Sequence, residues 1–224
     1  LAVAYPQSCA ICGGSVEQRR LGVTCDECWK ETRIFTGEET ICRKCGLLAE
    51  VDAAPEFRDE VRCMRCEGWA FTAARAVGPY DGALREAVLR LKRKPHLPSY
   101  LEALLLAAAA REPLSDSTKV VPVPLHARRL KTRGFNQAAL IARMIARRRG
   151  LPLDEVSLER VSGTEKYRAG MDPKGRRETV AGAFVVRHPR LIADEKVLLV
   201  DDVFTTGATV SACASGAHAI GEAL

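Results

Sequence analysis

Apolar residues after position 80 recur alternately at the spacing of helices and of strands. After Asp81, a face spaced for a helix continues until Pro95 and Pro98 break the pattern. Its members are Leu84, Ala87, Val88 and Leu91. A second helix, rich in alanine and leucine, is predicted from Tyr100 to Arg111. A third is predicted to begin at Gly134, with an apolar face of Phe135, Ala138, Ala139, Ala142 and Ile145.

Short apolar runs between these stretches predict strands. They cover residues 120–123, 156–161, 183–186 and 197–200, and a last helix is predicted from Thr209 onward. Helices that alternate with strands are typical of an α/β fold with a mostly parallel sheet and helices on both faces. Residues 70–224 suffice for one such domain, and no apolar run is long enough to predict a transmembrane helix or insertion into a membrane.

The last strand leads into a stretch with distinctive chemistry. Val197 to Val200 suit a buried strand, and two carboxylates, Asp201 and Asp202, follow it directly. The loop that comes next contains Thr205, Thr206, Gly207, Ala208 and Thr209. N–H groups and hydroxyls at a helix N-terminus bind phosphate, and paired carboxylates accept hydrogen bonds from vicinal hydroxyls. The pattern predicts a site for a ribose that carries a phosphate.

Two other interpretations of this stretch stay open. A strand that ends in two aspartates also occurs in Mg²⁺ sites of the Walker B type, and it can simply enter a polar turn. A Walker A sequence is absent, because the stretch from Gly170 to Gly175 continues with Arg176 and Arg177 instead of lysine and serine or threonine.

Cysteines dominate the N-terminal part of the chain. Eight of the nine form four C-x-x-C pairs, Cys9/Cys12, Cys25/Cys28, Cys42/Cys45 and Cys63/Cys66. The two-residue gap lets both sulfurs face one metal ion, so eight thiolates predict two structural zinc ions, each with four cysteine ligands. Iron–sulfur ligation and disulfides are the alternatives. Residues 1–69 hold too few large apolar residues to fold without metal, and they form the first predicted domain, a double zinc-ribbon module.

Spacing favours sequential sharing of the metals. The pairs 9/12 and 25/28 would hold one ion and the pairs 42/45 and 63/66 the other, because this arrangement closes the shorter loops, although a crossed arrangement stays open. The ninth cysteine, Cys213, is expected to be a small buried apolar residue in the last helix.

Net charge says little about partners. The formal value is +6, and two Zn²⁺ ions with eight thiolates would reduce it to roughly +2. Basic residues are clustered, however, at residues 90–94, 128–133, 147–149 and 174–177. Such runs are usually solvated, but two of them flank the predicted ligand loops and could neutralise a diphosphate or a nucleic-acid backbone.

The stretch from Val197 to Ser211 resembles the phosphoribosyl-pyrophosphate (PRPP) signature of type I phosphoribosyltransferases. With the four C-x-x-C pairs, the sequence Pro122-Val-Pro-Leu125 and the sequence Arg133-Gly-Phe-Asn-Gln137, the whole chain resembles the ComF family. The resemblance implies a type I phosphoribosyltransferase-like domain over residues 70–224. Asp201 and Asp202 would then hold the ribose hydroxyls and act in catalysis, Thr205 to Thr209 would hold the 5′-phosphate, and Mg²⁺ would accompany PRPP.

The same resemblance places the segment from Pro124 to Arg133 near the diphosphate. Arg128, Arg129 and Arg133 are the candidate contacts, and the alternative is that Arg133 and Asn136 only cap and orient the next helix. Residues 160–182 resemble the family's flexible loop, with Tyr167, Lys174 and Arg176 as candidate contacts. Glu165–Tyr167 and Thr179 depart from the family pattern there.

The ends of the sequence are also informative. It begins with leucine instead of methionine, and it stops inside the last predicted helix, where the fold normally adds another strand. We therefore expect that a few N-terminal residues are missing and that the C-terminal part is incomplete.

The resemblance implies two functions from different classes. The first is Mg²⁺-dependent transfer of a phosphoribosyl group from PRPP, or from a related ribose phosphate, to an acceptor that the sequence does not identify. The second is non-catalytic handling of single-stranded DNA during natural transformation, with a DNA-uptake helicase as a partner. Trp29, Phe35, Phe57 and Trp69 are the aromatic candidates for stacking on bases, while Trp69 and Phe71 are more readily explained by packing between the domains. A cytoplasmic location is expected.

Overall fold

Two parallel strands, β3 (Lys119–Pro122) and β6 (Val197–Val200), lie at the centre of the α/β part of the chain. The computed structural model describes residues 7–49, 54–161 and 182–218. Lys119 pairs with Val197 and Pro122 with Val200, and a single parallel bridge joins Val120 to Leu153. Both strands match the prediction, and within the described residues they make up the parallel part of the fold, which is smaller than the predicted sheet.

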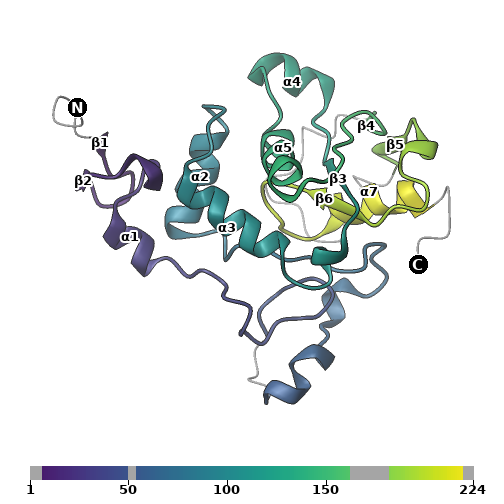
Figure 1. Cartoon of the computed structure of the whole chain (residues 1–224), viewed down its shortest axis with the longest axis horizontal. Coiled ribbons are helices and arrows are strands. Elements are labelled where there is room, and N and C mark those ends of the chain that lie inside the picture. The colour runs from purple at the N-terminus through teal and green to yellow at the C-terminus, as the bar shows by residue number, and fades with distance from the viewer. Residues whose placement is uncertain (1–6, 50–53, 162–181, 219–224) are drawn as a thin grey trace.

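Helices cover both faces of this pair, because alternate residues of a strand point to opposite sides. Val120, Leu198 and Val200 belong to the core beneath α5 (Gln137–Arg149). Leu91, Ala109 and the α5 residues Ile141, Ala142, Met144, Ile145 and Ala146 complete that core. Val121 and Val123 face the other way, toward a second core with Ala208 and Cys213 of α7 (Ala208–His218). Figure 1 shows α5 and α7 on either side of β3 and β6.

Cys213 is 1% exposed, which confirms the expectation of a small buried residue. Burial raises the pKa of its thiol, so the side chain stays protonated in this core.

The remaining elements extend this arrangement. Helices α2 (Gly82–Leu91) and α3 (Ser99–Ala109) match the first two predicted helices, and the side chain of Asp81 accepts a hydrogen bond from the N–H of Gly82. Strands β4 (Leu158–Arg160) and β5 (Phe184–Val186) pair antiparallel next to α7. The predicted flexible-loop contacts Tyr167, Lys174 and Arg176, with the Glu165–Tyr167 and Thr179 departures, lie outside the described residues.

The prediction that Gly134 begins a helix is wrong. Gly134 ends helix α4 (Ala127–Arg133) in the left-handed conformation, with φ of 80°, and α5 begins three residues later at Gln137. A glycine in that conformation is the usual end of a helix. Asn136 is the N-cap of α5, since its Oδ1 accepts a hydrogen bond from the N–H of Ala138 at 3.1 Å.

Each cysteine-rich segment packs on a different part of the α/β fold. The first segment contains β1 (Gln7–Ser8), β2 (Ser15–Val16) and α1 (Asp26–Glu31), and its Leu21 and Trp29 share a core with Ala83, Leu84, Ala87 and Leu101 of α2 and α3. The second segment, through Cys42, Cys45 and Cys66, packs near β6 and α7 instead. Figure 1 shows the two segments on different sides of the molecule. Short 3-10 helices cover Arg19–Leu21, Pro55–Glu60, Met64–Cys66, Leu114–Asp116 and Pro189–Leu191.

Among the residues that the structure describes, no helix is both long and apolar enough to cross a bilayer.

Candidate functional site

The eight cysteines of the C-x-x-C pairs form two separate clusters. One contains Cys9, Cys12, Cys25 and Cys28, the other Cys42, Cys45, Cys63 and Cys66, and within each the sulfurs all lie within 4.8 Å of one another. The sequential sharing predicted from spacing is therefore confirmed, and the crossed arrangement is excluded.

The sulfur positions fit zinc. The Sγ atoms of Cys9 and Cys28 are 3.9 Å apart, and those of Cys42 and Cys66 are 3.6 Å apart. Four sulfurs around one Zn²⁺ at about 2.3 Å would be roughly 3.8 Å apart, whereas a disulfide brings two sulfurs to about 2.05 Å. All nine cysteines are free of disulfides.

Electrostatics also favours a cation at the centre of each cluster. Burial and the neighbouring sulfurs raise the pKa of Cys66 to about 11. Burial opposes ionisation of Cys42 as well, but the backbone N–H groups of Cys45, Cys63 and Lys44 lower its pKa to about 6. In the first cluster, burial likewise opposes ionisation of Cys9, but backbone N–H groups lower its pKa to about 6, while burial and the neighbouring sulfurs raise the pKa of Cys28. Each cluster therefore pairs one thiol that ionises easily with one whose ionisation a metal ion would favour.

A cavity of about 420 Å³ opens where β6 ends and α5 and α7 begin. It is lined by residues from separate elements, namely Tyr80, Lys92, Val123, Pro124, Leu125, Arg129, Arg133, Asn136, Gln137, Ala138, Arg160, Asp201, Asp202, Val203, Thr205, Thr206, Ala208 and Thr209. Of the eight residues predicted to hold PRPP, seven line this cavity, and Gly207 is the exception. The carboxyl end of a parallel strand is where open α/β folds usually bind their ligands.

The acidic pair sits at the floor of the cavity. The Asp201 Oδ1 accepts a hydrogen bond from the N–H of Asp202 at 2.8 Å. Burial and the adjacent Asp202 raise the pKa of Asp201 to about 7, and Lys92 opposes that rise. The Nζ of Lys92 lies 3.7 Å from Asp202 Oδ2, so the end of α2 supplies a cation to the pair. Two carboxylates in this setting suit Mg²⁺, which prefers oxygen ligands, or the hydroxyls of a sugar.

The phosphate loop runs from Thr205 to the start of α7. Thr205, Thr206, Ala208 and Thr209 face the cavity, where hydroxyls and N–H groups at a helix N-terminus can donate to an anion. Gly207 has φ of 73° and is turned toward Trp69, since a β-carbon on it would lie 2.3 Å from Trp69 Cζ3. A glycine in a phosphate loop usually lets the backbone approach the ligand, but the close neighbour of Gly207 in the structure is an indole ring.

The opposite wall is built around the start of α5. The Nη1 of Arg133 donates to Gln137 Oε1 at 2.6 Å, and the Nδ2 of Asn136 donates to the carbonyl oxygen of Val123 at 3.0 Å. The capping interpretation therefore holds for Asn136, while Arg133 also lines the cavity. Arg129 lines it as well, and Arg128 is exposed and does not.

Several residues that line the cavity are not among those predicted to hold PRPP. Lys92 lies within a basic run, but only the packing of α2 brings it to Asp202. Arg160 is 8% exposed and its guanidinium lies 5.4 Å from the centre of the Phe184 ring. Tyr80 is the aromatic residue of the cavity wall, whereas none of Trp29, Phe35, Phe57 and Trp69 lines it. The sequence does not point to Tyr80, because its position depends on how α2 packs.

Comparisons with known proteins support the resemblance found in the sequence. The double zinc ribbon domain matches residues 1–67. The chain is 27% identical over 219 residues to the DNA utilization protein YhgH of Escherichia coli (strain K12), which covers 93% of this chain and 89% of that protein. It is 24% identical over 227 residues to competence protein ComFC of Bacillus subtilis (strain 168), and this match covers 90% of this chain and 85% of ComFC.

A shorter match, 36% identical over 93 residues, covers 41% of this chain and 40% of competence protein F of Haemophilus influenzae. No solved structure matches the chain. The resemblance to the ComF family is thus confirmed: residues 1–67 match the double zinc ribbon domain, and the chain is similar over most of its length to the YhgH and ComFC proteins.

Proposed function

We propose that this chain is a DNA-handling protein whose cavity binds PRPP or a related ribose phosphate together with Mg²⁺. The observation that carries the proposal is that one cavity is lined both by the segment between β6 and α7, with Asp201, Asp202 and the phosphate loop, and by Arg133 at the end of α4. The proposed division into a zinc-ribbon module, residues 1–69, and a phosphoribosyltransferase-like domain, residues 70–224, stays a prediction. So does a cytoplasmic location.

Each wall of the cavity has a distinct task in this proposal. The two aspartates accept hydrogen bonds from the ribose hydroxyls, and Thr205, Thr206 and Thr209 donate to the 5′-phosphate. Arg129 and Arg133 face a diphosphate on the opposite side, where a guanidinium can form two parallel hydrogen bonds to phosphate oxygens. Bound Mg²⁺ would supply further positive charge to the diphosphate.

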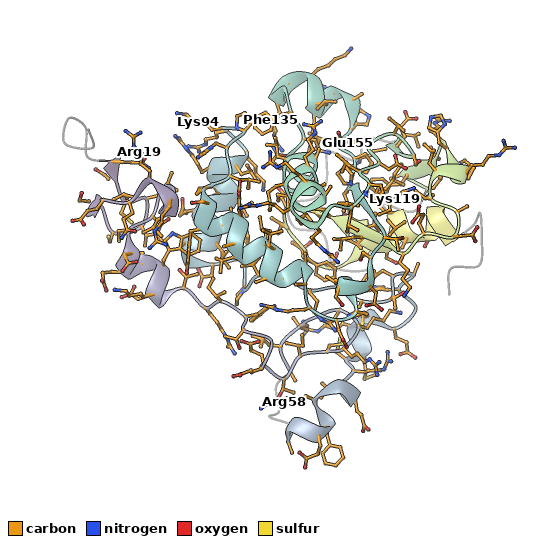
Figure 2. The ribbon with its side chains drawn as sticks, in the orientation of Figure 1. Arg19, Arg58, Lys94, Lys119, Phe135 and Glu155 are labelled. Carbon is orange, nitrogen blue, oxygen red and sulfur yellow. The ribbon has the colours of Figure 1, made fainter. Side chains whose placement is uncertain are left out.

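The DNA-handling part of the proposal rests on the relatives and on the charge around the cavity. One relative is named a DNA utilization protein, and others are named competence proteins. In this chain, Arg93 and Lys94 beyond α2 and Arg128 and Lys131 on α4 are exposed, next to the partly buried Lys92, Arg129 and Arg133 of the cavity. Figure 2 shows Lys94 and Phe135 along the same edge of the molecule. Exposed basic groups at the mouth of a phosphate site suit a single-stranded nucleic-acid backbone.

Phosphoribosyl transfer is the second candidate. It is favoured by the cations Lys92, Arg129 and Arg133 around the cavity, which could stabilise the charge on a departing diphosphate. In this candidate the bond between the anomeric carbon and the diphosphate oxygen breaks, the acceptor's nucleophile forms the new bond, and diphosphate leaves. The acceptor stays unidentified, and a DNA-uptake helicase as a partner stays a prediction.

Titration calorimetry of the zinc-loaded protein tests the proposal. With PRPP and Mg²⁺ we expect a dissociation constant on the order of micromolar, and with short single-stranded DNA an affinity that falls steeply with salt. The double variant Arg128→Gln/Lys131→Gln should weaken DNA binding but leave PRPP binding unchanged.

Arg58→Gln is the matched control, since Arg58 lies at the opposite edge of the molecule (Figure 2), and it should change neither affinity. Binding of DNA without PRPP would contradict the ribose-phosphate site, and binding of PRPP without DNA would contradict the DNA-handling part. Release of diphosphate from PRPP in the presence of an acceptor would support the second candidate.

A further inference from the structure

The second cysteine cluster packs against the back of the phosphate loop. Cys42, Cys45 and Cys66 share a buried core with Phe71 and with Ala214 of α7. Around this core lie residues from both parts of the chain, among them Trp69, Leu199, Phe204 and Val210. Zinc ligands and the loop that follows the acidic pair therefore belong to one packing unit.

Trp69 contacts the loop after β6 directly. Its ring centre lies 5.9 Å from that of Phe204, and 5.3 Å from that of Phe71. A β-carbon on Gly207 would approach three atoms of the indole to between 2.3 and 2.8 Å. Real β-carbons do not approach so closely, so the indole and the backbone of Gly207 are in direct van der Waals contact.

The zinc cluster fixes where Trp69 lies. Trp69 lies three residues after Cys66, the last cysteine of the cluster. The backbone N–H of Trp69 donates to the carbonyl oxygen of Cys66 at 3.2 Å. Its own carbonyl oxygen accepts from Lys44 Nζ at 2.6 Å, and Lys44 lies between Cys42 and Cys45. The indole Nε1 is buried and makes no hydrogen bond to any described residue, so packing alone orients the ring.

A hydrogen bond continues this contact into α7. The N–H of Ala70 donates to Ser211 Oγ at 3.1 Å, and the N–H of Ser211 donates to the carbonyl oxygen of Gly207 at 2.8 Å. The segment after the second cluster thus holds the phosphate loop at its glycine and at the first turn of the helix behind it.

We propose that Trp69 is a positioning residue of the ribose-phosphate site, and that the second cysteine cluster supports the phosphate loop of that site, whereas the first cluster packs on α2 and α3. Trp69 does not line the cavity, so it acts through Gly207 and not on the ligand. The inference rests on the proposed function for the ligand that it names. Loss of metal from Cys42, Cys45, Cys63 and Cys66 would release the cysteine turn, withdraw the indole and leave the loop without support on one side.

The first test needs no ligand. Hydrogen exchange of residues 203–211 should become at least about tenfold faster in Trp69→Leu and in Cys42→Ser/Cys45→Ser, because local opening of the loop costs less free energy. The matched variant Cys9→Ser/Cys12→Ser should leave these residues unchanged. Exchange in α5 serves as the control for global folding.

The second test adds PRPP and Mg²⁺. We expect the dissociation constant to rise at least about tenfold in Trp69→Leu and much less in Trp69→Phe, which keeps a ring against Gly207. The chain has two tryptophans, so Trp29→Phe leaves Trp69 as the sole emitter. Its fluorescence should change when PRPP is added.

The outcomes separate the two proposals. Unchanged exchange of residues 203–211 in Trp69→Leu overturns the positioning role, whatever the protein binds. If the wild-type protein binds no PRPP but hydrogen exchange of residues 203–211 still depends on Trp69, the proposed ligand is wrong. The role of Trp69 in positioning the loop is then still supported. If Cys42→Ser/Cys45→Ser fails to fold, the comparison of Trp69→Leu with Trp69→Phe decides.

Discussion

The two cysteine clusters are each built from two C-x-x-C pairs, but they support different parts of the molecule. The first packs through Trp29 on α2 and α3, where the Trp29 and Tyr100 rings meet edge to face at 4.9 Å. The second packs through Trp69 on the loop after β6. Each ribbon thus presents one tryptophan to the α/β part, and only the second meets the backbone that follows the acidic pair. Equivalent metal chemistry therefore does not imply equivalent roles.

Removal of the first metal should have the largest effect, and it should be local. In Cys9→Ser/Cys12→Ser we expect loss of one zinc ion and of about 10 kcal/mol of local folding free energy, since structural zinc largely supplies the stability of such modules. Trp29 is 4% exposed, so its emission, isolated in a Trp69→Phe background, should shift to longer wavelength. The same shift of Trp29 emission in Cys42→Ser/Cys45→Ser would contradict the conclusion that the two clusters support different parts of the molecule.

Removal of the acidic pair should abolish binding and leave both ribbons intact. For Asp201→Asn/Asp202→Asn we expect the affinity for PRPP with Mg²⁺ to fall by about 100-fold or more, roughly 3 kcal/mol. Zinc content, measured by atomic absorption, should stay at the two ions that the two clusters predict. Unchanged affinity would contradict the proposed ligand site.

Two glycines allow the contact with Trp69 to be isolated. Gly207 and Gly134 both have positive φ, at 73° and 80°, but a β-carbon added at Gly207 would meet the indole, whereas one added at Gly134 would meet no atom within 4 Å. Gly134→Ala should lower the free energy of unfolding by about 1 kcal/mol, the cost of the left-handed backbone. Gly207→Ala should lower it by about 2 kcal/mol more, because the methyl group also overlaps the indole. The free energy of unfolding is measured by urea denaturation. If both variants lose the same amount, the Trp69 side chain moves aside without an energetic cost, and the proposed contact is wrong.

The smallest expected effect concerns the charge on Asp201. Burial raises its folded pKa to about 7 from the ordinary value of 3.8, so the folded state binds this proton more tightly than the unfolded state. The contribution of this carboxyl group to stability is therefore greatest at low pH and is lost as pH rises between those two values. The variant Asp201→Asn has no carboxyl group at this position, so it does not lose this stability as pH rises. At pH 8 it should be more stable than wild type by an amount on the order of 1 kcal/mol, while binding PRPP less well. A wild-type stability that is flat from pH 5 to pH 8 in urea unfolding would contradict this.

Features encoded over a few residues could be predicted from the sequence. The cysteine clusters, strand β6 and the helix after Thr209 all follow from short spacings, and the structure contains them. The apolar pattern predicts that Gly134 begins a helix, whereas Gly134 ends α4. The residue in the sequence that marks the true start of α5 is its N-cap, Asn136.

Contacts between distant segments could not be predicted. The bond from Ala70 to Ser211 joins residues 141 positions apart, and the approach of Lys92 to Asp202 depends on how α2 packs. Gly207 illustrates the limit: its motif predicts the loop to which it belongs, but not its nearest neighbour, because that neighbour comes from a segment more than half the chain away.

Asn136 has a consequence for reading the sequences of homologues. Its oxygen caps α5 and its nitrogen donates to the carbonyl oxygen of Val123, just after β3, so a single amide satisfies two backbone groups of opposite polarity. Aspartate would lack the donor, and serine or threonine would not reach both partners with one hydroxyl. Selection for the fold alone is therefore enough to keep asparagine in the Arg-Gly-Phe-Asn-Gln sequence, so its invariance in an alignment would not by itself indicate a contact with the ligand.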